Sequence, residues 1–303
     1  MEWKGRRRSS NVEDRRGERV SGASQGSSAA GGMLLSLFFR SSKKTKLFVV
    51  VAGLVAMFVF GISPMSVLNF VGGGSGEPVV TRDAPAPNDE MRAFLSTIKA
   101  DNEDVWAGLF LEQGMAYRPA KMVIYSDQTV MPGGVADARM GPFYMPANET
   151  VYIDPHFFRE MKERFGAPGD FAQAYVIAHE IGHHIQNLLG YTDKVHGQRG
   201  RASKKEYNQL SVRLELQADF LAGVFAHHAD QQFNFLEDGD IREAMNCARA
   251  IGDDTLQKQS GGRVMPDSFT HGTSAQRAKW FMKGYRSGDV KQGNTFELPY
   301  GQL

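Results

Sequence analysis

Hydrophobic and polar positions divide the chain into one segment that is apolar on every side and a longer part with regular amphipathic spacing. No charged residue lies between Lys46 and Glu77, and Leu47–Ile62 is almost wholly apolar, with Met65–Val71 extending the run beyond Ser63-Pro64. A helix needs about 20 such residues to cross a bilayer. The pattern predicts a transmembrane helix at residues 46–71.

Two alternatives fit this apolar segment less well. A cleaved signal peptide begins close to the N-terminus, whereas a polar lead of some 46 residues precedes this segment and no small-residue cleavage site follows it. A buried core helix of a soluble protein normally has one polar face, which this segment lacks. We therefore expect a single-pass membrane protein.

Downstream of a Gly- and Pro-rich linker at residues 72–88, apolar residues recur at the spacing of helices and short strands. The amphipathic helices predicted there, apart from two longer ones, are Met91–Gly114, Phe157–Phe165, Asp240–Ile251 and Thr273–Ser287. Lys121–Tyr125 is typical of a strand, and Pro142–Met145 with Thr150–Ile153 is typical of a hairpin. Residues 89–303 are predicted to form one folded domain.

Two longer helices follow the hairpin. The first is predicted from Asp170, an N-cap candidate that Gln173 would complete as a capping box, to Gly190, which is placed to end it. The second begins at Ser203, where Glu206 completes another capping box. Both helices carry an apolar stripe at helical spacing, so each has a face that the domain can bury.

Charge separates the N-terminal part from the rest. Residues 1–46 hold eleven Lys/Arg and four Asp/Glu, which leaves 24 of the 35 basic and 30 of the 34 acidic residues elsewhere. Basic residues just before an apolar helix keep its N-terminal flank in the cytoplasm, so the domain at residues 89–303 is expected to be exported. Residues 1–45, rich in Arg, Ser and Gly, are predicted to be a disordered tail. The domain is not basic enough to indicate a nucleic-acid partner.

The first long helix carries a His-Glu-x-x-His motif. Residues four apart lie on one face of a helix, so His179 and His183 can direct two imidazole nitrogens at one metal ion. Glu180 then lies beside the water that such an ion holds. A surface helix with two chance histidines is the alternative, and the apolar stripe of this helix disfavours it. His184 points away from the motif face and is expected to pack rather than bind metal.

The second long helix offers the missing ligand. Catalytic zinc has three protein ligands and an open position, and Glu215 is the candidate for the third. Asp219 lies four residues on and can accept the other N–H of a ligating histidine. The alternative for both is a solvated helix face, but their neighbours Leu214, Leu216 and Phe220 are apolar. We expect one Zn²⁺ per chain, with zinc favoured over other metals by ligand type alone.

These residues carry a family resemblance. His179-Glu180-x-x-His183 followed by Glu215-x-x-x-Asp219 resembles the gluzincin class of metallopeptidases, and nearly the whole chain is similar to membrane-anchored neutral zinc metallopeptidases of bacteria. The segments that carry this similarity are Trp3–Arg7, Asn11–Arg16, Gly141–Tyr144, His183–Asn187, Ile251–Asp254 and His271–Arg277. The resemblance implies an α+β, zincin-like domain of the small gluzincin type, with a small sheet above the motif helix.

The resemblance also implies roles for His271 and Arg277, which lie six residues apart. Related small gluzincins place a histidine and an arginine near the substrate carbonyl, so His271 would donate a hydrogen bond to the oxyanion while Arg277 orients it or anchors its loop. The alternative is that His271 caps the helix near Thr273 and that Arg277 is a surface residue.

The function expected is hydrolysis of peptide bonds by a metal-activated water, with Glu180 as the general base. A zinc-stabilised scaffold or latent peptidase at the membrane is the alternative, since it would keep the ligands without needing Glu180 as a base. The expected partners are a peptide or protein substrate and the membrane, and the sequence specifies no oligomeric state. The lone Cys247 excludes an internal disulfide.

Overall fold

The computed structural model describes residues 1–21, 79–82, 89–259 and 264–303. They fall into two compact units, Met1–Gly17 with Ala84–Leu303 and, separately, Glu18–Asp83. In the smaller unit, β2 (Glu18–Ser21) pairs antiparallel with β3 (Val79–Arg82). The predicted transmembrane helix at residues 46–71 lies outside the described residues. Among the helices that are described, none is long and apolar enough to span a bilayer.

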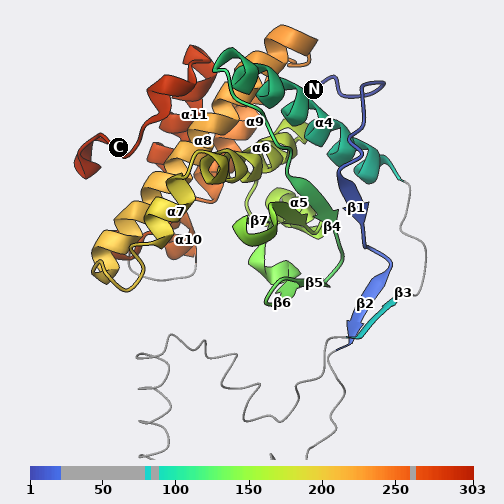
Figure 1. The fold of residues 1–303 in the computed structure, drawn as a ribbon, viewed down its shortest axis with the longest axis horizontal. Coiled ribbons are helices and arrows are strands. Elements are labelled where there is room, and N and C mark those ends of the chain that lie inside the picture. Colours follow the sequence, from blue (N-terminus) through green and yellow to red (C-terminus); the bar gives the residue numbers. More distant parts are fainter. Residues whose placement is uncertain (22–78, 83–88, 260–263) are drawn as a thin grey trace, which may run out of the picture. The chain divides into compact units, whose positions relative to one another are not determined.

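The larger unit consists mainly of helices, with short strands between the first helix and the second (Figure 1). Its α-helices are α4 (Glu90–Glu112), α5 (His156–Glu163), α6 (Asp170–Leu188), α7 (Tyr191–His196), α8 (Lys204–Phe233), α9 (Asp240–Ala250), α10 (Asp253–Gln259) and α11 (Ser274–Ser287). Its strands are β1 (Val12–Asp14), β4 (Lys121–Ile124), β5 (Gln128–Met131), β6 (Gly134–Asp137), β7 (Phe143–Met145) and β8 (Thr150–Ile153). An α+β class dominated by helices is confirmed.

The principal sheet has the strand order β1-β4-β8-β7. Strands β1, β4 and β8 are parallel, whereas β7 is antiparallel to β8 and forms one edge. The predicted hairpin is confirmed as β7 and β8, with Phe143 opposite Tyr152 and a 3-10 turn at Pro146–Asn148. All four residues of β8 are buried, as expected of a strand between two neighbours. Strands β5 and β6 form a separate hairpin.

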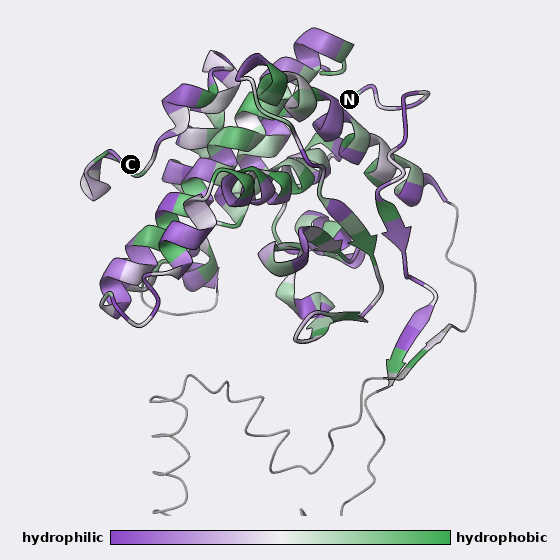
Figure 2. Ribbon diagram, in the orientation of Figure 1, coloured by the Kyte–Doolittle hydropathy of each residue, from purple (hydrophilic) through white to green (hydrophobic). Residues whose placement is uncertain are grey.

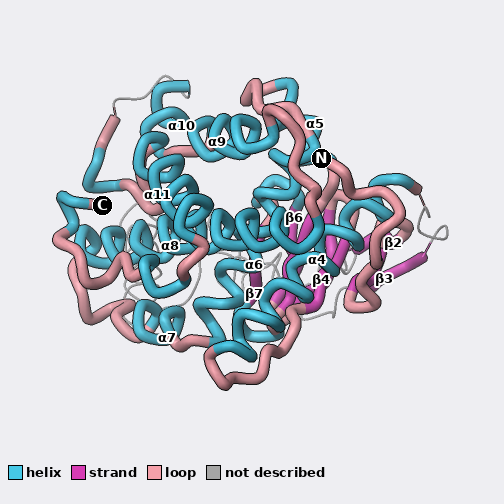
Figure 3. The backbone as a smooth tube through the Cα atoms, turned by 90° about the horizontal axis from the view of Figure 1, so that it is seen from above, coloured by secondary structure: helices cyan, strands magenta, loops and turns pink. Residues whose placement is uncertain are grey.

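Helix α6 lies in the middle of the unit, where it packs against α8, α9 and α4, while α11 packs along α8 (Figure 3). Apolar residues gather on α6 and on the central part of α8 (Figure 2). The aromatic side chains Phe171, Tyr175, Phe220, Trp280 and Phe281 are fully buried in this core. The apolar stripes read from the sequence therefore meet one another and hold the two long helices together.

Close helix packing depends on glycines at the α8–α11 crossing. A Cβ at Gly223 would lie 2.1 Å from the carbonyl oxygen of Phe281, and one at Gly284 would lie 2.0 Å from that of Phe220. Any side chain at either position would force the helices apart. This contact places the start of α11, and therefore Arg277, against the central part of α8.

Two sequence predictions need correction here. Helix α6 begins at Asp170 with Gly169 as its N-cap and without a side-chain cap, so the capping box with Gln173 is wrong. The Asp170 carboxylate instead lies 3.1 Å from the α-ammonium group of Met1. The capping box of Ser203 and Glu206 on α8 is confirmed, and Gly190 follows α6 in a left-handed conformation as predicted.

The predicted disordered tail is wrong for residues 1–17. Met1 is 7% exposed within the main core, and β1 pairs with β4. Composition indicated disorder because this segment has too few apolar residues to form a core of its own. It is ordered because it uses the core and the charged residues of the rest of the domain.

Candidate metal centre

The two motif histidines present their Nε2 atoms to one carboxylate. His179 and His183 project from successive turns of α6, with ring centroids 4.8 Å apart. Nε2 of His179 lies 3.2 Å from one carboxylate oxygen of Glu215, and Nε2 of His183 lies 3.5 Å from the other. One ligand atom from each of the three residues can be chosen so that all lie within 4.8 Å of one another. The structure thus brings together the three ligands predicted from the sequence.

Gly182 allows the second helix to come this close. A Cβ at Gly182 would lie 3.0 Å from the carbonyl oxygen of Ala218 and 3.1 Å from its Cα. Gly182 immediately precedes the ligand His183 on α6, and Ala218 immediately precedes Asp219, the support of His179, on α8. A larger residue at Gly182 would displace α8 and with it the Glu215 carboxylate.

Each ligating histidine is held through its other ring nitrogen. Nδ1 of His179 lies 2.8 Å from Oδ1 of Asp219, and Nδ1 of His183 lies 2.9 Å from Oε1 of Gln186. The Gln186 amide donates to the carbonyl of Leu214 and to Oε1 of Gln217, which fixes its oxygen toward His183. With Nδ1–H donated in this way, both Nε2 lone pairs are available to a metal.

Asp219 contacts His179 at the position predicted for a supporting residue, and Gln186 takes the equivalent place beside His183, which was not predicted from the sequence. The only sequence signal for Gln186 is its position three residues after His183, on the same face of the helix. A glutamine at that spacing is too common to identify a function. Only the contacts of the Gln186 amide with Leu214 and Gln217 on α8 show that this side chain is held in one orientation.

Arg277 lies behind His179 and is buried, with 2% of its surface exposed. Its Nε and Nη2 donate to the two carboxylate oxygens of Asp219 at 2.8 and 3.0 Å, and the Tyr175 hydroxyl donates to Asp219 as well. The alternative of a surface position for Arg277 is therefore wrong. Its contact is with the carboxylate that supports a ligand, and not with the loop of His271.

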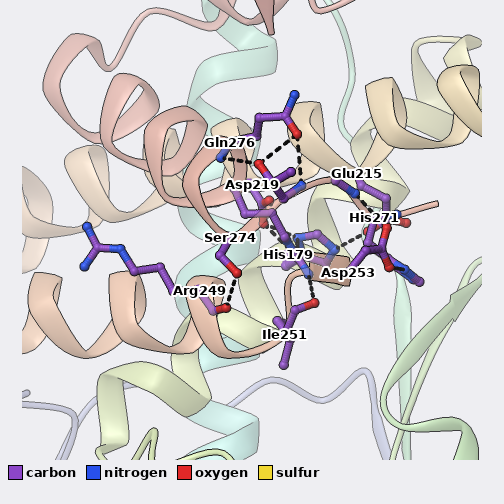
Figure 4. A network of polar contacts seen from close by, with 12 residues as sticks. His179, Glu215, Asp219, Arg249, Ile251, Asp253, His271, Ser274 and Gln276 are labelled. Carbon is purple, nitrogen blue, oxygen red and sulfur yellow. Dashed lines mark hydrogen bonds and ion pairs between the residues drawn. The ribbon is translucent and has the colours of Figure 1, made fainter. Parts of the chain in front are cut away.

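Asp253, at the start of α10, orients His271 instead. Its Oδ2 accepts backbone N–H groups from Thr270, His271 and Gly272 at 2.7, 2.6 and 3.0 Å, and its Oδ1 lies 3.1 Å from Nδ1 of His271 (Figure 4). The charge of Glu215, followed by the Asp253 contact, raises the pKa of His271. His271 therefore faces the metal-site carboxylate from a loop that Asp253 holds in one conformation.

The electrostatics of the cluster suit a cation. Burial alone would lower the pKa of His179, but the Asp219 and Glu215 carboxylates outweigh it and raise that pKa to about 10. Burial alone would raise the pKa of Glu215, but the neighbouring His183, His271 and His179 outweigh it and hold that pKa below the ordinary value. Two imidazoles, each held through its other ring nitrogen, and one carboxylate are a donor set that fits Zn²⁺.

Glu180 lies in the same cavity as the three ligands. It is 8% exposed, and burial, together with the charge of Glu215, raises its pKa to about 7 against the opposing effect of His179. The backbone N–H of Tyr144 on edge strand β7 donates to its carboxylate. A carboxylate with a pKa near neutrality is able both to accept and to donate a proton.

The cavity has a volume of about 680 Å³ and runs between β7 and α5 on one side and α7 with the start of α8 on the other. Phe143, Phe157 and Phe165 contribute apolar surface on the first side. His196 and Arg199 contribute basic groups on the second. His184 does not reach it, because Nδ1 meets the Tyr144 hydroxyl at 2.9 Å and Nε2 meets the Arg118 carbonyl. The packing role predicted for His184 is confirmed.

Comparison with known proteins agrees with this geometry. A family model described as "Putative neutral zinc metallopeptidase" matches residues 1–296. "Uncharacterized protein YpfJ" of Escherichia coli K12 is 48% identical over 300 residues, covering 98% of this chain and 99% of its own length. "Uncharacterized protein Rv2575" of Mycobacterium tuberculosis H37Rv is 36% identical over 262 residues, covering 78% of this chain and 84% of its own length. No solved structure gives a significant match.

Proposed function

The chain belongs to the family described as "Putative neutral zinc metallopeptidase", and from this premise we propose that it is a zinc-dependent endopeptidase. The observation that carries the proposal is the convergence of His179, His183 and Glu215 beside Glu180 in one cavity. A scaffold would need the three ligands. It would have no need of a buried carboxylate with a raised pKa at the open side of the metal.

Bound Zn²⁺ would supply Lewis acidity and lower the pKa of a water molecule toward ~7. His179, His183 and Glu215 would hold it. Glu180 accepts the proton from the attacking water and then delivers it to the leaving amine. The hydrogen bond from the Tyr144 backbone keeps the Glu180 carboxylate in place between these two steps. Because Tyr144 belongs to β7, the strand beside the substrate also positions the base.

His271 is suited to stabilise the oxyanion of the tetrahedral intermediate. Its Nδ1 contacts Asp253, which leaves Nε2 for the substrate, and its raised pKa favours the protonated donor form. We propose that Asp253 and its three backbone contacts position this imidazole. Arg277 acts elsewhere, by holding Asp219 against His179.

A peptide substrate is expected to bind in an extended conformation along β7. This strand is an edge of the principal sheet, and its residues Phe143 and Tyr144 line the cavity. An added strand there would extend the sheet beside β7, and its side chains would alternate between the cavity and solvent. Membrane attachment through residues 46–71 and the absence of a nucleic-acid partner are part of the same proposal.

The test uses the full-length protein, with zinc content and casein cleavage measured for the parent and for Glu180→Gln. We expect one zinc per chain in both, and a loss of cleavage of about 10²–10⁴-fold in the variant. Glu163→Gln, an exposed glutamate on α5, is the matched control and should keep full activity. One zinc with cleavage by neither protein would favour a latent peptidase or scaffold. Absence of zinc from the parent would refute the metal centre.

A further inference from the structure

The first residues of the chain are part of the catalytic domain's own sheet. Strand β1 pairs in parallel with β4, with Val12 opposite Met122 and Asp14 opposite Ile124. The backbone N–H of Met122 donates to the Asn11 carbonyl at 2.9 Å, and that of Arg15 donates to the Ile124 carbonyl at 2.7 Å. Because β4 is paired on its other side with β8, β1 completes one edge of the same sheet.

Buried polar contacts also fasten this segment to helix α4. We call this cluster the N-terminal junction, and it comprises Arg6, Arg7, Ser9 and Asn11 against Lys99, Asp101 and Glu103. Oε1 of Glu103 accepts hydrogen bonds from Ser9 at 2.7 Å and from Asn11 at 2.9 Å. Arg6 lies 2.7 Å from Asp101, which is 2% exposed. Ser9, Lys99, Asp101 and Glu103 are buried, so the contacts that they make hold the N-terminal segment firmly against α4.

The chain leaves and re-enters the described structure at neighbouring points. In the two-stranded unit, Ser21 is the cross-strand partner of Val79, and Glu18 is the partner of Arg82. Paired residues on antiparallel strands have Cα atoms about 5 Å apart. The two ends of segment 22–78 therefore lie side by side, so this segment is an insertion that begins and ends at one place.

A single crossing of the membrane is incompatible with this arrangement. The hydrocarbon core of a bilayer is about 30 Å thick, and one crossing of segment 46–71 would place its two flanks on opposite faces. Strands β1 and β4 cannot pair through a bilayer. We propose that residues 1–17 and 89–303 lie on the same side of the membrane.

The sequence indicates no second crossing that would return the chain. Leu47–Val71 is long enough for one crossing of about 20 residues but not for two. The other apolar run, Met33–Phe39, is much shorter and is separated from it by Arg40, Lys43, Lys44 and Lys46.

The shared side is the cytoplasmic one. The same four basic residues precede the apolar run, and basic flanks of this kind are retained in the cytoplasm. Applied to the N-terminus alone, this rule predicts an exported domain, but that prediction requires residues 1–45 and the domain to be independent. Strand β1 pairs with β4 of the domain, so retention of the N-terminal flank in the cytoplasm retains the catalytic domain there as well. The consequence is a membrane-attached peptidase whose substrates are cytoplasmic.

Accessibility of single cysteines to a membrane-impermeant maleimide tests the proposal in the full-length protein. Cys247, which is buried, is first replaced by Ala. Arg8→Cys then reports on the N-terminal segment and Lys162→Cys on α5, both at exposed positions. We expect neither to react in intact cells, where the reagent reaches the exterior and the periplasm, and both to react after lysis. The Cys247→Ala chain without a reporter sets the background.

Reaction of one reporter and protection of the other in intact cells would establish a single crossing and overturn the proposal. Reaction of both would overturn the cytoplasmic assignment. Neither readout depends on peptidase activity. Failure of this proposal is therefore distinguishable from failure of the proposed function.

Discussion

The metal-site cluster and the N-terminal junction are both built from buried charged side chains, and they differ in how those charges are balanced. In the junction, Lys99 meets Glu103 at 2.7 Å and Arg6 meets Asp101 at 2.7 Å, so cations face anions within the protein. In the metal-site cluster, two imidazole Nε2 atoms and a carboxylate converge on one another at the wall of a cavity.

The difference shows how a binding site can be told from a structural ion-pair network. Burial of charge is unfavourable unless a partner compensates it, and in the junction the buried charges are paired with opposite charges of the same chain. The metal-site cluster is balanced from behind, by Asp219, Arg277 and Gln186, but its Nε2 atoms face only a carboxylate that is itself a ligand. The open side of the metal-site cluster therefore needs a cation, whereas the buried cations and anions of the junction already pair with one another.

The largest effect should come from removing the junction altogether. A chain that begins at Asp89 lacks β1 and leaves Asp101 and Glu103 without their N-terminal partners, so we expect it to aggregate or remain unfolded. A matched chain in which Asn-Gly replaces residues 22–78 keeps β1 and closes β2 and β3 with a two-residue turn. It should be recovered in the soluble fraction and unfold cooperatively. Equal thermal stability of the two chains would contradict the structural role of the junction.

One glutamate from each cluster gives a matched pair of substitutions. Glu103→Gln leaves the Lys99 ammonium, which is 0% exposed, without its charged partner, and should lower the free energy of unfolding by about 3–5 kcal/mol. Zinc affinity should not change. Glu215→Gln removes a ligand, so zinc binding and cleavage should fall to background while the metal-free protein stays folded.

Denaturant unfolding in the presence of a chelator, together with zinc titration against a competing chelator, separates these two outcomes. The chelator removes the contribution of bound metal to stability, so the unfolding measurement reports the protein alone. Loss of zinc affinity in Glu103→Gln would mean that the two clusters are coupled through α4 and α6, and the distinction drawn here would fail.

Much of the site could be predicted from the sequence, because its signals are local. The four-residue spacing of His179 and His183 fixes their shared face once the helix is recognised, and Glu215 and Asp219 repeat that spacing on α8. The Ser203 capping box located the start of that helix correctly. These inferences need only helix geometry, and they place three ligands and one supporting carboxylate.

The remaining residues could not be predicted, because their roles depend on contacts between distant segments. Arg277 supports Asp219 only because Gly223 and Gly284 bring α11 against α8. Asp253 orients His271 across 18 residues of sequence. The prediction of disorder for the N-terminal segment failed for the same reason. Composition indicates whether a segment has enough apolar residues to form its own core, and not whether it packs against the core of another segment.

The two histidine supports should have a smaller effect than the ligands. Asp219→Asn removes the negative charge of the acceptor for Nδ1–H of His179, and Gln186→Leu removes the acceptor for Nδ1–H of His183. We expect zinc affinity or cleavage to fall by about 10–100-fold in each. Asp219→Asn should also destabilise the fold, because Arg277 loses its charged partner, whereas Gln186→Leu should not. Zinc titration and thermal unfolding of both variants would show this split. An unchanged affinity in Gln186→Leu would mean that His183 is oriented by packing alone.

The smallest expected effect is a pH dependence of the free energy of unfolding that arises from Asp101 in the junction. Burial, against the opposing charge of Arg6, raises the pKa of Asp101 from 3.8 to about 7. Between these values the folded state holds a proton that the unfolded chain has released, so this group's contribution to stability falls as the pH rises from about 4 to about 7. Asp101→Asn removes the titration, and its free energy of unfolding should vary less with pH across that window than the parent's. Urea unfolding at several pH values measures this, with the exposed Asp238→Asn as control. Parallel curves for parent and Asp101→Asn would show that Asp101 stays ionised in the fold, and that the junction is as fully charged as its ion pairs suggest.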